Sequence, residues 1–209
     1  MLVPSGATSF AEAMRIGSEC YHSLKKKIAS KYGTEGTFLR GFVIDFEATG
    51  IGDEGGFAPP VSRPEEALEL LTDAVADAGY TRKVSFAIDP ASQEFMLENG
   101  NYDLDKKSTG RMHEILSPVQ LQSRYHQLIS SYPIVLLEDP FGQDDWETWT
   151  SFARDCQIEL VGDDLLATNI ERLKIAIDKS ACNSMLLKVN QIGTVSEALA
   201  AYYDPLNYF

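Results

Sequence analysis

Three short apolar runs in this sequence end in a carboxylate, and a fourth ends in a lysine. The residues that close the runs are Asp89, Glu138, Asp163 and Lys188. The last three are evenly spaced, and an interval of about 25 residues holds one buried strand and one returning helix. Because the parallel strands of such a repeat bring their C-terminal ends to one edge, the sequence predicts three acids and an amine around one site.

The pattern between these residues indicates an α/β repeat. From residue 84 onward, short continuous apolar runs alternate with amphipathic stretches, as expected for strands that are covered on both faces of a parallel sheet. The expected strands span 84–88, 134–138, 158–163 and 184–189. The expected helices span 117–131, 145–155, 169–179 and 194–203. The fold class is therefore α/β, with the repeating unit of a β/α barrel.

Two amphipathic helices are expected before this repeat. Ser9 with Glu12, and Ser62 with Glu65, have the spacing of capping boxes at helix starts. Each is followed by apolar residues at helical spacing until a glycine, as expected for two helices that pack on a core.

Composition excludes some classes of partner. A formal net charge of -13 on 209 residues disfavours nucleic acid, which is bound mainly through clustered Lys and Arg. The three cysteines are widely spaced and favour free thiols in a reducing compartment, and no apolar run reaches the length of a membrane span. We therefore expect a cytoplasmic protein with no nucleic acid partner and no membrane span.

The strand-end acids predict a metal ion. Placing Asp89, Glu138 and Asp163 around one site is costly unless a cation lies among them. Oxygen ligands without His or Cys favour a hard ion, Mg²⁺ before Ca²⁺. Such a cation would also favour the neutral amine of Lys188, which could then accept a proton. Taken singly, each acid could instead be a solvated loop residue or a helix cap.

A glycine-rich acidic loop is a further candidate. Residues 52–56 read GDEGG, so the backbone can approach a ligand closely while a carboxyl group points toward it. By itself the loop is equally consistent with an acidic turn.

Together, these stretches closely resemble the enolase family (phosphopyruvate hydratase). The motifs, in family order, are GDEGGFAP at 52–59, LEDPF at 137–141, DDW at 144–146, GDDL at 162–165 and LKVNQIGT at 187–194. The resemblance implies a partial (β/α) TIM-type barrel of the enolase C-terminal domain over residues 1–201, lacking the first and last strands. Residues 38–49 are then expected to be an insertion with β character, and residues 202–209 a divergent tail.

The resemblance also implies the roles of individual residues. Asp89, Glu138 and Asp163 would bind Mg²⁺, and Asp164 would hold these ligands in place without touching the ion. The implied activity is that of a lyase, the Mg²⁺-dependent dehydration of 2-phosphoglycerate to phosphoenolpyruvate in glycolysis. Family members form homodimers.

Two further residues would act on the substrate in this family. Lys188 would remove the C2 proton and Glu54 would assist departure of the C3 hydroxyl. A lysine base combined with Mg²⁺ is the known pattern of the superfamily.

Two other functions are consistent with the sequence. The first is a catalytically inactive enolase fragment or isoform that at most binds Mg²⁺ or an intact enolase partner. It follows from the expected absence of the family's cationic phosphate-binding stretch, for which reason we expect no measurable turnover by this chain. The second is another Mg²⁺-dependent, proton-abstracting barrel that acts on a different carboxylic acid.

Overall fold

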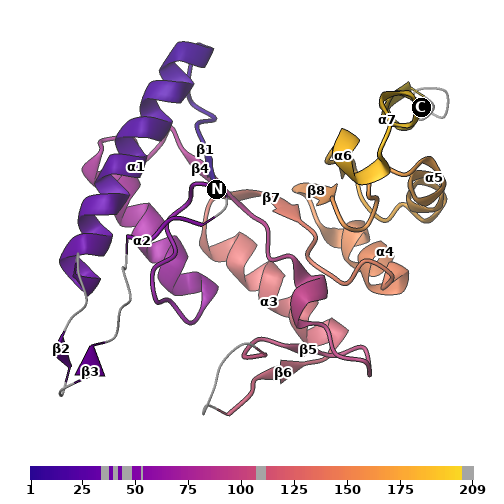
Figure 1. Cartoon of the computed structure of the whole chain (residues 1–209), viewed down its shortest axis with the longest axis horizontal. Helices are drawn as coiled ribbons and strands as arrows, with labels where there is room; N and C mark the ends of the chain where they lie inside the picture. The colour runs from indigo at the N-terminus through magenta and orange to yellow at the C-terminus, as the bar shows by residue number, and fades with distance from the viewer. Residues whose placement is uncertain (34–37, 40–41, 44–48, 53, 107–111, 204–209) are drawn as a thin grey trace. The chain divides into compact units, whose positions relative to one another are not determined.

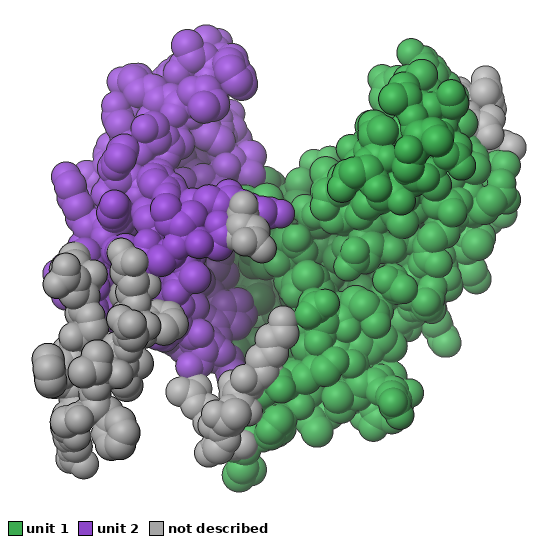
Figure 2. All heavy atoms as spheres, viewed as in Figure 1, with its two compact units in different colours: residues 1, 86–209 green, residues 2–85 purple. Residues whose placement is uncertain are grey.

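The computed structural model describes residues 1–33, 38–39, 42–43, 49–52, 54–106 and 112–203. The chain divides into two compact units, coloured separately in Figure 2. Unit 1 comprises residue 1 and residues 86–209, and unit 2 comprises residues 2–85.

Unit 2 is built on two helices, α1 (Phe10–Tyr32) and α2 (Pro64–Asp77), which pack side by side (Figure 1). A two-residue strand, β1 (Leu2–Val3), precedes them. Their buried faces carry apolar residues at helical spacing, which confirms the two amphipathic helices. These buried residues are Ile16, Cys20, Ile28, Leu68, Leu70, Ala74 and Val75.

The two predicted capping boxes differ from the observed helix starts. Ser9 caps α1 by accepting the N–H of Glu12 at 3.1 Å, but the Glu12 carboxylate accepts hydrogen bonds from Thr8 rather than returning to Ser9. The second box is wrong. The N-cap of α2 is Arg63, without a side-chain cap, because Pro64 takes the first helical position, where its fixed φ fits and its missing N–H costs nothing.

Between these helices, part of the predicted insertion is strand. β2 (Phe38–Leu39) pairs antiparallel with β3 (Phe42–Val43), in agreement with the expected β character. The rest of 38–48 lies outside the described residues, as do residues 204–209 of the predicted tail.

Unit 1 contains the predicted parallel sheet. Neighbouring strands pair in the order β4 (Ser85–Ile88), β7 (Ile134–Glu138), β8 (Glu159–Gly162) and β9 (Ser184–Met185). They are joined through α3 (Pro118–Ser131), α4 (Trp146–Asp155) and α5 (Ile170–Lys179). The strand and helix order confirms the α/β fold class. The described strands form an open sheet and not a closed barrel.

The end of the repeat corrects one expectation. A strand was expected over 184–189, but β9 ends at Met185 and a short helix, α6 (Val189–Ile192), begins directly after Lys188. β9 lies at the edge of the sheet and pairs with only two residues of β8, so few ladder hydrogen bonds extend it. Helix α7 (Val195–Tyr203) follows.

An aromatic cluster supports the segment that follows β7. The Phe141 ring packs edge to face with Tyr102, Tyr125, Trp149 and Phe152, and all five side chains are buried. Their polar atoms also bind this segment, since the Tyr102 hydroxyl accepts the Gly142 N–H at 3.0 Å and the Trp149 indole donates to the Gly142 carbonyl at 3.2 Å. The cluster therefore fixes the loop between β7 and α4.

The remaining elements lie between β4 and α3. They are a 3-10 turn, η1 (Ser92–Phe95), and an antiparallel pair, β5 (Tyr102–Asp103) with β6 (Ile115–Leu116). Gly100, at φ 80°, makes a tight turn in which its N–H donates to the Leu97 carbonyl at 3.0 Å. No helix in the described part of the chain is long and apolar enough to cross a membrane.

Candidate metal and base site

Asp163 and Lys188 are in direct contact, one directly after β8 and the other three residues after β9. The Lys188 Nζ donates to Asp163 Oδ2 at 2.5 Å, and the Gln191 side chain donates to Asp163 Oδ1 at 2.7 Å. Asp163 follows β8 and is only 8% exposed. The two residues, 25 apart in the sequence, therefore meet beyond two adjacent strands, although Lys188 lies three residues past the end of β9.

Glu138, at the end of β7, belongs to the same charged group. Partial burial and, to a smaller extent, the negative charges of Asp89, Asp163 and Asp139 together raise the pKa of its carboxyl to about 7, while Lys188 acts in the opposite direction. Asp89, which follows β4, is exposed and accepts the Ala91 N–H at 2.9 Å. The structure thus places the strand-end acids and the lysine within electrostatic reach of one another.

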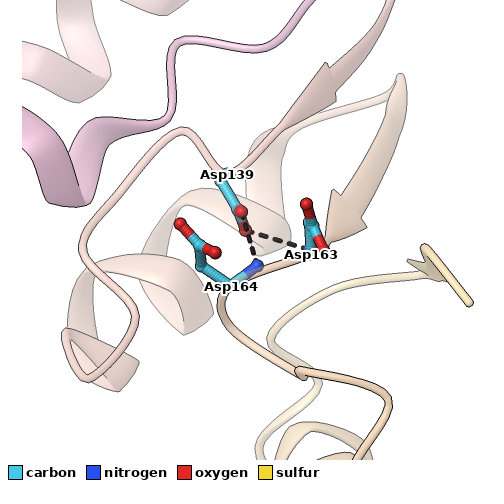
Figure 3. Close-up of side chains that lie close together, drawn as sticks. All are labelled: Asp139, Asp163 and Asp164. Carbon is cyan, nitrogen blue, oxygen red and sulfur yellow. Dashed lines mark hydrogen bonds between the residues drawn. The ribbon is translucent and has the colours of Figure 1, made fainter. Parts of the chain in front are cut away.

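Asp139 has a role that the sequence analysis missed. It is 3% exposed and lies at φ 43°, in the left-handed region that Asp tolerates better than most residues. Its carboxylate accepts the backbone N–H groups of Asp163 and Asp164 at 3.1 and 2.6 Å (Figure 3). It also accepts the N–H of Leu165 at 3.4 Å. Asp139 therefore shapes the turn that carries Asp163. No sequence signal separates this role from that of the neighbouring Glu138.

Asp164 lies beside this turn. One carboxylate oxygen from each of Asp139, Asp163 and Asp164 lies within 4.8 Å of the others (Figure 3). Burial raises the pKa of Asp139 to about 6, with a smaller contribution from the charge of Asp164, although the three backbone hydrogen bonds act in the opposite direction. The supporting role expected for Asp164 stays a prediction.

The backbone of Lys188 is fixed by a buried threonine. The Lys188 N–H donates to the Thr168 hydroxyl at 2.8 Å. Thr168 is fully buried and lies at φ 52°, a costly conformation for a β-branched residue. This contact, and that of Gln191, were also missed. Gln191 lies three residues after Lys188, so a helical interpretation of this segment would have placed both on one face.

Glu54 belongs to unit 2 and the other predicted site residues to unit 1. It is exposed, in a turn where the Gly52 N–H donates to the Gly56 carbonyl at 2.9 Å. Its role toward the substrate stays a prediction, and Asp53 lies outside the described residues.

The donor set fits a hard divalent cation. The clustered groups offer carboxylate oxygens, and the pKa values of Glu138 and Asp139 are raised first by burial and then by neighbouring carboxylates, both of which a bound cation would offset. Among the described residues, only Asp139, Asp163 and Asp164 bring three carboxylate oxygens within 4.8 Å of one another. The predicted Asp89, Glu138 and Asp163 do not form such a compact group, although Asp89 and Asp163 both raise the pKa of Glu138 through their charges.

The hydrogen bonds favour the predicted set. Both Asp139 oxygens accept backbone N–H groups and would lose them on facing an ion, whereas the Glu138 carboxylate accepts no hydrogen bond from the described residues. Asp139 is thus better suited to orient a ligand than to be one.

Comparison with known families agrees with the resemblance. Residues 1–207 match the family model described as enolase, C-terminal TIM barrel domain. The match spans nearly the whole chain and includes the segment expected to be an insertion.

Proposed function

Because the chain belongs to the family of the enolase C-terminal TIM barrel domain, we propose that its site is that of a Mg²⁺-dependent hydro-lyase that converts 2-phosphoglycerate to phosphoenolpyruvate. The observation that carries the proposal is the contact of Lys188 with Asp163 beside the crowded carboxyl of Glu138. A base and an acidic cluster at neighbouring strand ends are the two parts that proton removal next to a carboxylate requires.

In this proposal, Asp89, Glu138 and Asp163 hold the ion. When bound, Mg²⁺ neutralises the acids and stabilises the negative charge that develops on the substrate carboxylate as its C2 proton leaves. Asp139 holds the turn that carries Asp163, and Asp164 would support the ligands without touching the ion.

The substrate is acted on by two side chains. Lys188, released from its ion pair with Asp163 when the ion is present, accepts the C2 proton through its neutral amine. Thr168 holds the backbone N–H of Lys188 and thereby limits the positions of its side chain. Glu54 of unit 2 would protonate the departing C3 hydroxyl.

Metal binding tests the first part of this proposal. Mn²⁺ takes oxygen ligands and is visible by electron paramagnetic resonance, so titration of the purified chain measures the dissociation constant, with Mg²⁺ as competitor. Glu138→Gln and Asp163→Asn should each weaken Mn²⁺ binding by about tenfold or more. Glu147→Gln, at an exposed position of α4, is the matched control and should leave it unchanged. Equal affinity in all variants would refute this ligand set.

A second candidate is a chain that binds Mg²⁺ without turnover. It is favoured by the charges around Glu138, where three carboxylates face one cation, Lys188. A substrate that carries both a phosphate and a carboxylate needs more positive charge than this group supplies.

A turnover assay separates the two candidates. With Mg²⁺ and 2-phosphoglycerate, we expect no measurable phosphoenolpyruvate from this chain, while Mn²⁺ still binds. Phosphoenolpyruvate formation that is lost in Lys188→Ala but retained in Lys179→Ala, at an exposed position of α5, would show that the chain itself is the catalyst and would refute the second candidate.

A further inference from the structure

Arg172 connects the two loops that leave β7 and β8. Its guanidinium donates from Nε to the Leu165 carbonyl, from Nη2 to the Gln143 carbonyl and from Nη1 to the Asp144 carboxylate, the last at 3.0 Å. It also lies over the Trp146 ring, 5.2 Å from the ring centre, which adds a cation–π contact. Its side chain is only 26% exposed. One side chain thus binds both loops at four points.

The helix that carries Arg172 does not explain its position. Arg172 lies in the first turn of α5, where Asn169 caps the N-terminus by accepting the Glu171 N–H at 2.8 Å. A cation at this end opposes the helix dipole. The favourable contacts of Arg172 are therefore those with the two loops and not those within its own helix.

The Leu165 peptide is the point where this connection meets the site. Its N–H donates to Asp139 Oδ1 at 3.4 Å, and its carbonyl accepts from Arg172. Asp139 directly follows β7 and Arg172 lies in the first turn of α5, so the turn that starts at Asp163 is held from both sides. Loss of either contact leaves a buried peptide group without one of its partners, because Leu165 is fully buried.

We propose that Arg172 is a positioning residue that fixes the turn bearing Asp163, and through it the metal ligand geometry. The effect of Arg172 on the ligand geometry rests on the metal site proposed above. The role requires the planar fork of the guanidinium, because its three nitrogens each reach a different acceptor, whereas the three N–H groups of an ammonium radiate from one nitrogen and cannot span the same separation. Lysine at this position would keep the charge and lose most of the connection.

Amide hydrogen exchange tests the positioning of the turn directly. In Arg172→Lys and Arg172→Gln, we expect exchange of the residue 163–165 amides to accelerate at least about tenfold, with a smaller change in the middle of α5. Arg154→Gln removes an exposed arginine of α4 and should leave these amides unchanged. Uniform acceleration along α5 without a specific effect at 163–165 would show a merely structural role and overturn the proposal. If Arg172→Gln does not fold, Arg172→Lys still decides the outcome.

Mn²⁺ titration of the same variants tests the link to the site. The dissociation constant should rise by about tenfold in Arg172→Gln, less in Arg172→Lys, and remain unchanged in Arg154→Gln. Unchanged Mn²⁺ affinity in both Arg172 variants would overturn the link. If the native chain binds no Mn²⁺, the proposed function fails, and amide exchange alone decides whether Arg172 fixes the turn.

Discussion

The turn after β8 and the segment after β9 each carry a residue of the candidate site, but they are held differently. The first turn begins at Asp163, and Asp139 and Arg172 bind it from two neighbouring elements. The second carries Lys188, which donates hydrogen bonds to Thr168 and Asp163, both of which belong to the first turn. Lys188 therefore depends on the turn after β8, which does not depend on Lys188 to the same degree.

This asymmetry indicates how the site is built. β8 lies between two strands and ends in a turn whose N–H groups at residues 163–165 all donate to Asp139. β9, in contrast, is a two-residue edge strand. The turn that carries Asp163 is thus held by the sheet and its loops. Lys188 is held by its contacts with that turn. Changes at the turn after β8 should affect both, and changes at Thr168 should affect Lys188 alone.

The largest effect is expected at Asp139. Asp139→Ala removes the acceptor of three buried backbone N–H groups and places alanine at φ 43°, so the free energy of unfolding should fall by about 2–4 kcal/mol. Asp139→Asn keeps one acceptor oxygen and tolerates this backbone conformation, so its loss should be about half as large. Urea unfolding measures both.

Asp155→Asn, at the exposed end of α4, is the control for removal of a carboxylate. If Asp139→Ala were as stable as this control, the turn after β8 would not depend on Asp139, and the asymmetry between the two segments would disappear.

A smaller effect is expected at Thr168. Thr168→Val keeps the shape and removes the hydroxyl that accepts the Lys188 N–H, so it should cost about 1–2 kcal/mol of unfolding free energy and accelerate exchange of the Lys188 amide. Thr168→Ser keeps the hydroxyl and should retain amide protection. The residue 163–165 amides should be unaffected in both. Accelerated exchange at those amides in Thr168→Val would contradict a one-way dependence.

The sequence predicted the parts of the site that follow from strand periodicity. Asp89, Glu138, Asp163 and Lys188 could be found because a buried strand leaves a continuous apolar run, and its end marks the edge of the sheet. The same argument gave the strand order and the helices between them.

Other contacts could not be predicted, because they depend on backbone groups that have no signature in the sequence. Asp139 and Arg172 bind peptide N–H and carbonyl groups far along the chain, and any residue can supply those. The early end of β9 also depends on the sheet, since its length is set by its pairing with β8 and not by the apolar run from Met185 to Leu187.

The smallest effect concerns the pH dependence of Glu138. Its pKa is about 7 in the folded chain against an ordinary value of 4.5, so the unfolded chain releases this proton first. The stability that protonated Glu138 contributes is present below pH 4.5 and is lost as the pH rises through about 7. Because the side chain is partly exposed, we expect a decline of at most about 1 kcal/mol.

Glu138→Gln mimics the protonated carboxyl and isolates this contribution from that of Asp139, which acts in the same direction. In chelator-treated samples, the variant and the native chain should be equally stable below pH 4.5, and the variant should become more stable as the pH rises to 7. With Mn²⁺ present, the native chain should be the more stable of the two, because the ion stabilises its ionised carboxylate. If the two proteins kept the same difference in stability from pH 4 to 8, ionisation of Glu138 beside the neighbouring acids would cost no stability. The main electrostatic argument for a cation at this site would then be lost.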